Sequence, residues 1–149
     1  MRRQSMDLRK YATNKTAPSY LRTYDLMFSR LVGREINLLE LGVLEGETLL
    51  LWRDYFPKGH IFGVDSNPPA RLNAEERIRV FTGNQTDPQI LDQAAAEAPG
   101  GFDIIIDGAS HIGEITRTSF WYLFDRYLKP GGFYAIEDWG TGYWEDSNR

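Results

Sequence analysis

"INLLELGVLEGETLLLWRDYF", residues 36–56, joins an almost uninterrupted apolar run to a glycine-bearing turn and then to a helical pattern. The run over 36–42 lacks the alternation of a half-exposed strand, so it predicts a strand that is covered on both faces. The stretch 46–56 is typical of a helix, and Pro57 marks its end. A strand, a turn and a helix in this order indicate an α/β fold.

The same order recurs along the chain. Further strands are predicted at 60–66, 78–83, 102–107 and 132–138, and further helices at 18–32, 87–98 and 113–128. Strands that alternate with helices form a parallel sheet with right-handed crossovers, because each helix carries the chain back to start the next strand. We therefore expect one α/β domain with a mostly parallel sheet and helices on both of its faces.

The apolar spacing also predicts which side chains fill the core. The helix at 113–128 has one core-facing stripe with helical spacing, made of Phe120, Leu123, Phe124, Tyr127 and Leu128. The first helix has a similar stripe, made of Leu21, Tyr24, Phe28, Leu31 and Val32. We also expect core positions, rather than a stacking surface, for Trp52, Phe56, Phe120 and Trp121.

Composition excludes several classes of protein. The 149 residues are 42% hydrophobic and carry a net charge of -4, which fits one globular domain and argues against a nucleic-acid-binding surface. No apolar run is long enough for a membrane span, and the basic cluster at Arg2, Arg3, Arg9 and Lys10 precedes no apolar stretch, so it is not typical of a signal peptide. Without cysteine there is no disulfide or zinc–thiolate site. We expect a cytoplasmic protein.

Carboxylates follow four of the five predicted strands. Ligands of open parallel sheets bind beyond the carboxyl ends of the strands, so these positions mark the expected site. They are Glu40, Asp65, Asp107, and the pair Glu137 and Asp138. Clustered carboxylates repel one another unless a cation binds among them, which indicates a cationic ligand or a metal ion.

The first turn distinguishes between cofactors. A dinucleotide fingerprint needs glycines where this chain has Leu44 and Glu47, and these side chains disfavour a pyrophosphate. Asp65 stands where a carboxylate can bind both hydroxyls of a ribose. A glycine turn and a ribose-binding acid without a phosphate cradle favour S-adenosylmethionine. Alternatively, Gly42 and Gly46 only permit a tight turn, and Asp65 only caps a helix.

Several motifs resemble the class I S-adenosylmethionine-dependent methyltransferases, namely "ELGVLEG", "GVDSN" and "LKPGGFYAIED". The motifs "YATNKT", "GNQTDP", "DGASH" and "AIEDW" are similar to those of the metal-dependent sugar O-methyltransferases of macrolide and related antibiotic pathways. The resemblance implies a Rossmann-like fold with strand order 3-2-1-4-5. It also implies a cofactor site formed by Glu40, Gly42, Gly46, Asp65, Ser66, Asn84, Gln85 and Asp107.

In that strand order the fourth and fifth strands are neighbours. Asp107, Glu137 and Asp138 are then expected to converge on a hard cation, Mg²⁺ or Ca²⁺, and the resemblance assigns them to magnesium. A dication lowers the pKa of a sugar hydroxyl, and His111 is the candidate catalytic base. The alternative for His111 is a capping or exposed loop residue, whereas His60 opens a strand and is interpreted as structural.

The resemblance predicts an O-methyltransferase that acts on a hydroxyl of a glycosylated natural product. We divide the chain into an N-terminal segment and helix, 1–35, and a cofactor-binding domain, 36–149. Only eleven residues follow Asp138, so the sixth and seventh strands of this fold are expected to be missing or supplied by an assembly. An exposed edge of the fifth strand favours a homo-oligomer. Tyr143 and Trp144 are candidates for an acceptor pocket.

Two alternatives to an O-methyltransferase stay open. One is a protein that binds S-adenosylmethionine without transferring a methyl group, and the other, less favoured, is an NAD-binding domain.

Overall fold

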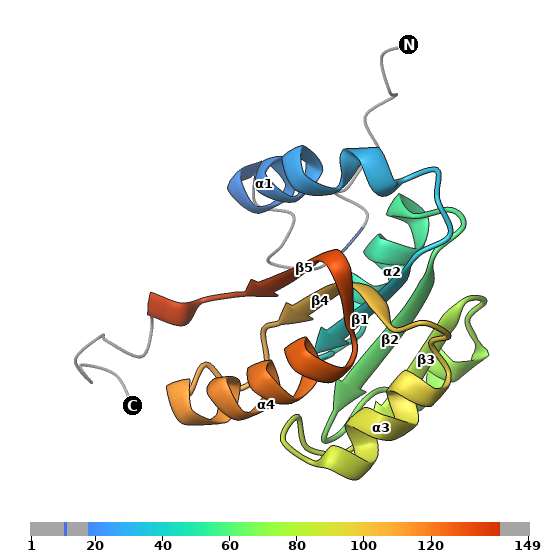
Figure 1. Ribbon diagram of the computed structural model, residues 1–149. Coiled ribbons are helices and arrows are strands. Elements are labelled where there is room, and N and C mark those ends of the chain that lie inside the picture. Colours follow the sequence, from blue (N-terminus) through green and yellow to red (C-terminus); the bar gives the residue numbers. More distant parts are fainter. Residues whose placement is uncertain (1–10, 12–17, 141–149) are drawn as a thin grey trace.

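The computed structural model describes residue 11 and residues 18–140, which form a five-stranded sheet with four α-helices (Figure 1). All strand pairs are parallel, and the strand order is β3-β2-β1-β4-β5. The strands are β1 (Asn37–Leu41), β2 (His60–Asp65), β3 (Ile78–Thr82), β4 (Phe102–Asp107) and β5 (Leu128–Ile136). The helices are α1 (Pro18–Phe28), α2 (Glu47–Tyr55), α3 (Pro88–Ala96) and α4 (Gly113–Arg126). The predicted fold class and strand order are confirmed.

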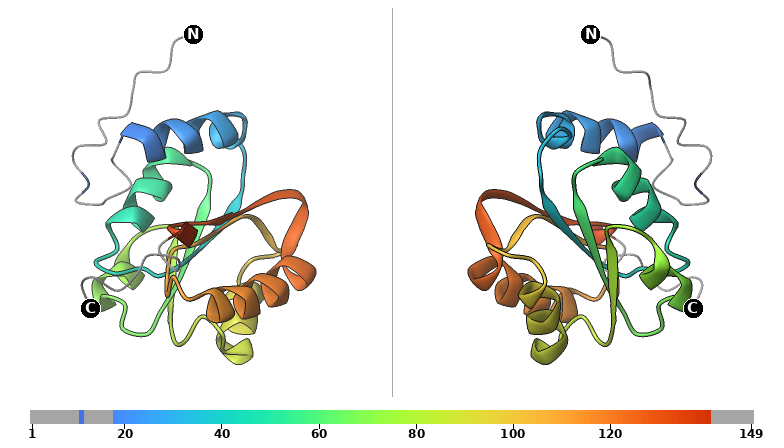
Figure 2. Two further views of the ribbon diagram at one scale, coloured as in Figure 1. Left: turned by 90° about the vertical axis from the view of Figure 1, so that its left-hand side faces the viewer. Right: turned by 90° about the vertical axis from the view of Figure 1, so that its right-hand side faces the viewer.

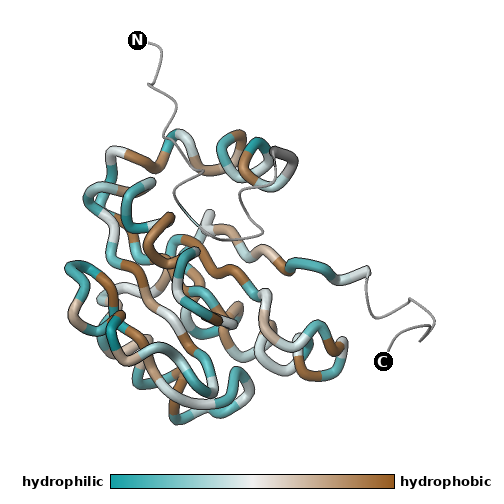
Figure 3. The backbone as a smooth tube through the Cα atoms, turned by 180° about the vertical axis from the view of Figure 1, so that it is seen from behind, coloured by the Kyte–Doolittle hydropathy of each residue, from teal (hydrophilic) through white to brown (hydrophobic). Residues whose placement is uncertain are grey.

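The sheet separates two helical layers. Helices α1 and α2 cover one face and α3 and α4 cover the other (Figures 1 and 2). Each face has its own core: Leu38 and Ile104 contribute to the core beneath α1 and α2, whereas Leu39 and Ile105 contribute to the core beneath α3 and α4. The strands are apolar along most of their length (Figure 3), as the uninterrupted runs predicted.

An aromatic cluster fixes α1 against the sheet. Phe28 is fully buried and its ring lies 5.4 Å from that of Phe133 on β5 and 6.1 Å from that of Trp52 on α2. Tyr24, one turn earlier, stacks on Phe28 at 5.2 Å. The first predicted stripe is therefore confirmed, and it holds the N-terminal helix beside the end of β5.

The predicted stripe of the last helix is only partly correct. Leu123 is buried, but the side chains of Phe124 and Trp121 are 44% and 55% exposed. Helix α4 packs on the sheet through Thr116, Ser119 and Leu123, and the Phe120 ring contacts that of Tyr134 on β5, whereas Trp121 and Phe124 lie on the outside of the helix. The helix ends at Arg126, and β5 begins at Leu128, earlier than predicted. Among the described residues β5 is a sheet edge, and no further strand covers these aromatic side chains.

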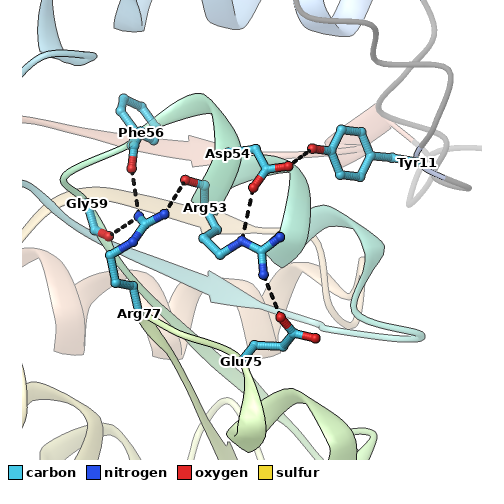
Figure 4. A network of polar contacts seen from close by, with 7 residues as sticks. All are labelled: Tyr11, Arg53, Asp54, Phe56, Gly59, Glu75 and Arg77. Carbon is cyan, nitrogen blue, oxygen red and sulfur yellow. Dashed lines mark hydrogen bonds and ion pairs between the residues drawn. The ribbon is translucent and has the colours of Figure 1, made fainter.

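The carboxyl end of α2 is closed by an arginine from a distant turn. The guanidinium of Arg77 donates to the carbonyls of Arg53, Phe56 and Gly59 at 2.8–3.1 Å (Figure 4). These carbonyls have no partner within a helix, and a cation also suits the negative end of its dipole. Near the same end of α2, the Tyr11 hydroxyl donates a hydrogen bond to the Asp54 carboxylate.

Some predictions fall outside the part of the chain that the structure describes. The basic cluster Arg2, Arg3, Arg9 and Lys10 lies there, as do Tyr143 and Trp144. Within residues 11 and 18–140, no helix is long and apolar enough to cross a membrane.

The two phenylalanines test this packing. Replacing Phe28 by alanine is expected to lower the free energy of unfolding by about 3–5 kcal/mol, because it opens a cavity between α1, α2 and β5. Phe124→Ala removes the same atoms from a half-exposed position and should cost less than about 1 kcal/mol. Urea unfolding at equilibrium measures both values. Equal losses in the two variants would contradict the buried position of Phe28.

Candidate functional site

The turns at the carboxyl edge of the sheet enclose a pocket of about 320 Å³. Five of the predicted cofactor residues line it: Gly42, Asp65, Ser66, Asn84 and Gln85. The turn after β4 completes the wall with Gly108, Ala109 and Ser110. Glu40, Gly46 and Asp107 do not line this pocket, although each stands in or beside one of its turns.

The first turn requires its two glycines. Gly42 has φ +88°, and a Cβ there would lie 2.8 Å from the Cα of Ala109, so only glycine lets the turns after β1 and β4 touch. Gly46 has φ +86° and packs against Leu72, where a Cβ would lie 2.6 Å from a methyl carbon. Gly46 therefore shapes the start of α2, whereas Gly42 faces the pocket.

Asp65 organises the same turn. Its Oδ2 accepts the backbone N–H groups of Val43 at 2.8 Å and Leu44 at 3.1 Å, and its Oδ1 accepts that of Asn67. Burial alone would raise the pKa of Asp65, but these backbone donors outweigh it and hold the pKa below its usual value. The carboxylate is thus ionised at neutral pH and borders the pocket.

Asp107 lies at the centre of a buried hydrogen-bond network. Its carboxylate accepts from the Gln85 amide at 3.3 Å and from the Ser119 hydroxyl at 3.2 Å. The Gln85 carbonyl in turn accepts the N–H of Ser110 at 3.1 Å. Burial raises the pKa of Asp107, against the opposing effect of the donors around it. Gln85 thereby links β4, α4 and the turn that carries His111.

The pair after β5 is held by a helix from the other end of the chain. The Tyr24 hydroxyl donates to Glu137 Oε1 at 2.5 Å, and the Tyr20 hydroxyl donates to Asp138 Oδ1 at 2.8 Å. Burial and the Glu137 carboxylate raise the pKa of Tyr24 well above its ordinary value, so it remains a donor. Sequence reasoning missed both tyrosines as site residues. The available signal is their i, i+4 spacing on α1, but only Tyr24 belongs to the predicted core stripe and Tyr20 does not.

His111 lies beside this pair. Its Nε2 is 3.6 Å from Asp138 Oδ2, and both side chains are partly exposed. Backbone φ angles of +56° at His111 and +52° at Asp138 place both residues in the left-handed region, as does +49° at Leu44. Such angles are uncommon outside glycine and cost free energy. Three of the four non-glycine residues with this conformation in the described chain therefore lie in turns at the carboxyl edge.

The three predicted metal ligands are not gathered into one group in the described part of the chain, and their role as ligands stays a prediction. Among residues 11 and 18–140, no three Asp, Glu, His or Cys side chains are grouped as metal ligands. Asp107 contacts α4, whereas Glu137 contacts α1 on the opposite face of the sheet. Neighbouring residues of a strand point to opposite faces, so the pairing of β4 with β5 does not by itself bring these carboxylates together.

Glu40 belongs to the α1 side as well. It is fully buried on β1, and its carboxylate contributes to the raised pKa of Tyr24. A carboxylate inside a sheet is costly to bury, and the predicted cofactor role of Glu40 stays a prediction.

Comparison with known proteins places these features in context. No protein-family model matches the chain. Mycinamicin VI 2''-O-methyltransferase of Micromonospora griseorubida is 40% identical over 128 residues, which are 81% of this chain and 31% of the relative. The 8-demethyl-8-(2-methoxy-alpha-L-rhamnosyl)-tetracenomycin-C 3'-O-methyltransferase of Streptomyces olivaceus is 42% identical over 127 residues, 80% of this chain and 32% of the relative. The chain spans about a third of the length of these relatives.

A solved structure supports the same relationship. The MycE methyltransferase of the mycinamycin biosynthetic pathway, in complex with Mg, SAH (S-adenosylhomocysteine) and mycinamycin VI, matches with a TM-score of 0.83 and 36% identity. The match covers 95% of this chain and 41% of that one. The sheet order and the helical layers described above are therefore those of the corresponding part of the MycE methyltransferase, about two fifths of its length.

The Gln85 link predicts a local effect. Replacing Gln85 by alanine removes the acceptor of the Ser110 N–H, so the amide of Ser110 should exchange with solvent at least about tenfold faster, which corresponds to losing one hydrogen bond of about 1.4 kcal/mol. Asn84→Ala alters the neighbouring pocket residue, whose side chain accepts hydrogen bonds from Thr86 in its own turn, and should leave Ser110 unchanged. Hydrogen exchange followed by NMR measures both. Unchanged exchange at Ser110 in Gln85→Ala would contradict the link.

Proposed function

We propose that this chain, which is homologous to the sugar O-methyltransferases of macrolide and related antibiotic pathways, is the cofactor-binding part of an O-methyltransferase. It binds S-adenosylmethionine and supports transfer of its methyl group to a hydroxyl of a sugar on a glycosylated natural product. Because the chain spans about a third of its curated relatives, the activity and the acceptor are proposals.

The observation that carries the proposal is the pocket between the turns after β1, β2, β3 and β4. It combines a glycine turn with no room for a side chain at Gly42 and an ionised carboxylate at Asp65. A ribose bound there can donate its hydroxyls to Asp65, and the amides of Asn84 and Gln85 lie on the wall where the adenine would pack. Leu44 and Glu45 give no cradle for a pyrophosphate, which disfavours NAD.

Glu137 and Asp138 fit a hydrated Mg²⁺ ion. Magnesium is commonly held by one or two carboxylates and completes its shell with water and substrate oxygens. Glu137 and Asp138 would hold it, at the edge of a second pocket of about 490 Å³ lined by Tyr20, Tyr24 and the end of β5. The bound dication would lower the pKa of the acceptor hydroxyl and orient it.

His111 is the proposed general base. Its imidazole accepts the proton of the acceptor hydroxyl through Nδ1 as the oxygen attacks the methyl group of S-adenosylmethionine. The bond between the methyl group and the sulfonium sulfur breaks, and S-adenosylhomocysteine leaves. The Asp138 carboxylate, 3.6 Å from Nε2, stabilises the imidazolium that forms. The strained backbone at both residues supports a functional role, because such angles concentrate at sites of chemistry.

The edge of β5 supports the predicted homo-oligomer. Trp121, Ile136 and Trp139 are exposed and line a shallow apolar hollow beside this strand. An unpaired strand edge next to apolar side chains favours association with another segment or chain.

The ribose role of Asp65 predicts a binding defect. Asp65→Ala should weaken binding of S-adenosylhomocysteine by roughly 10- to 100-fold, because two hydrogen bonds of about 1 kcal/mol each are lost together with the turn they support. Asp87→Ala is the control, since Asp87 caps α3 at the same edge but does not line the pocket. Calorimetry with S-adenosylhomocysteine and with NAD measures the affinities. Tighter binding of NAD by the unaltered chain would overturn the proposed function.

The base role of His111 predicts a separation of binding from transfer. In the protein that catalyses the transfer, His111→Ala should reduce the rate by roughly 10²- to 10⁴-fold while binding of S-adenosylhomocysteine is unchanged. His60→Ala, at the far end of β2, should leave both unaltered. Mass spectrometry of glycosylated acceptors, which gain one methyl group, follows the reaction. An undiminished rate in His111→Ala would exclude this residue as the base.

A further inference from the structure

The end of β4 presents two successive residues to opposite faces of the sheet. Asp107 is paired with Ile136 across the β4–β5 ladder, and its side chain contacts Ser119 of α4. The next residue, Gly108, lies beside Glu137, whose N–H donates to the Asp107 carbonyl at 2.9 Å. The face that holds Glu137 and its partner Tyr24 is therefore the face toward which a side chain at 108 would point.

A glycine occupies this position. A Cβ at residue 108 would lie 2.7 Å from Glu137 Oε2 and 3.6 Å from its Cδ. Gly108 has an ordinary negative backbone φ, unlike Gly42, so its backbone does not require glycine. The missing side chain instead leaves room for the Glu137 carboxylate, which lies close to β4 while it accepts a hydrogen bond from the Tyr24 hydroxyl.

We infer that the cation site of this chain has two protein carboxylates, Glu137 and Asp138. The third ligand position of the site is residue 108 and not Asp107. The glycine at 108 leaves that position empty. The inference rests on the proposed function for the presence of a cation. It assigns Asp107 a positioning role through Gln85 instead of a ligand role.

The charge balance has a consequence for binding. Two carboxylates give a weaker site than three, because affinity for a hard cation rises with the number of charged oxygen ligands. More of the coordination shell is then left to water and to the acceptor hydroxyl. The cation should bind weakly to the protein alone, and an added carboxylate at 108 should convert the pair into a stronger site.

The test uses Mn²⁺ as the probe, without cofactor or acceptor, in calorimetry and electron paramagnetic resonance. Gly108→Asp should tighten Mn²⁺ binding by about tenfold or more. Gly108→Ala adds the same Cβ without charge, and Gly33→Asp adds the same charge at a distant turn where a Cβ has open space. Neither control should tighten binding. Adding Glu137→Gln to Gly108→Asp should remove most of the gain.

Asp107→Asn in the otherwise unaltered chain provides a second test that does not depend on folding of the Gly108 variants. Mn²⁺ binding should be the same as in the original chain, whereas Glu137→Gln should weaken it. The inference is overturned if Asp107→Asn weakens Mn²⁺ binding as much as Glu137→Gln, or if Gly108→Asp binds no better than Gly33→Asp. Binding of S-adenosylhomocysteine, measured in the same samples, reports separately on the proposed function.

Discussion

The two-residue period of a β-strand is the constraint on which this site depends. At the carboxyl edge of the parallel sheet every strand delivers one residue to the layer of α1 and α2 and the next to the layer of α3 and α4. Glu40 and Glu137 belong to the first layer, and Asp107 belongs to the second. The carboxylates that look clustered along the sequence are thus sorted by the sheet into two environments with different partners.

The two environments are suited to different tasks. On the α4 side, hydrogen bonds connect Asp107, Gln85 and Ser119 to one another. The Asp107 carboxylate therefore helps to hold the turn after β4 in place. On the α1 side, tyrosine hydroxyls donate to the Glu137 and Asp138 carboxylates without neutralising them. A tyrosine hydroxyl is a neutral donor, so these two hydrogen bonds do not cancel the charge of the carboxylates.

Much of the fold could be predicted because buried parallel strands have a simple pattern. The limits of β1 to β4 agree with the apolar runs to within about one residue, and the glycine turn and Asp65 lie at the predicted pocket. The start of β5 and the exposed side of α4 could not be predicted. Lys129, Pro130 and Gly131 carry no strand signal, and the aromatic spacing of α4 does not reveal that Thr116 and Ser119 face the sheet.

The sequence by itself determined the parallel α/β order, the glycine turn and the supply of carboxylates to one edge, because these follow from local periodicity and from the rule that parallel strands end on the same side. Only the tertiary structure decided which carboxylates share a face and which helix holds them. Tyr20 and Tyr24 lie more than a hundred residues before Asp138 and Glu137, and the edge-to-face packing of Phe28 against Phe133 brings them there. Contacts of that range depend on the packing of the whole domain, and no local pattern encodes them.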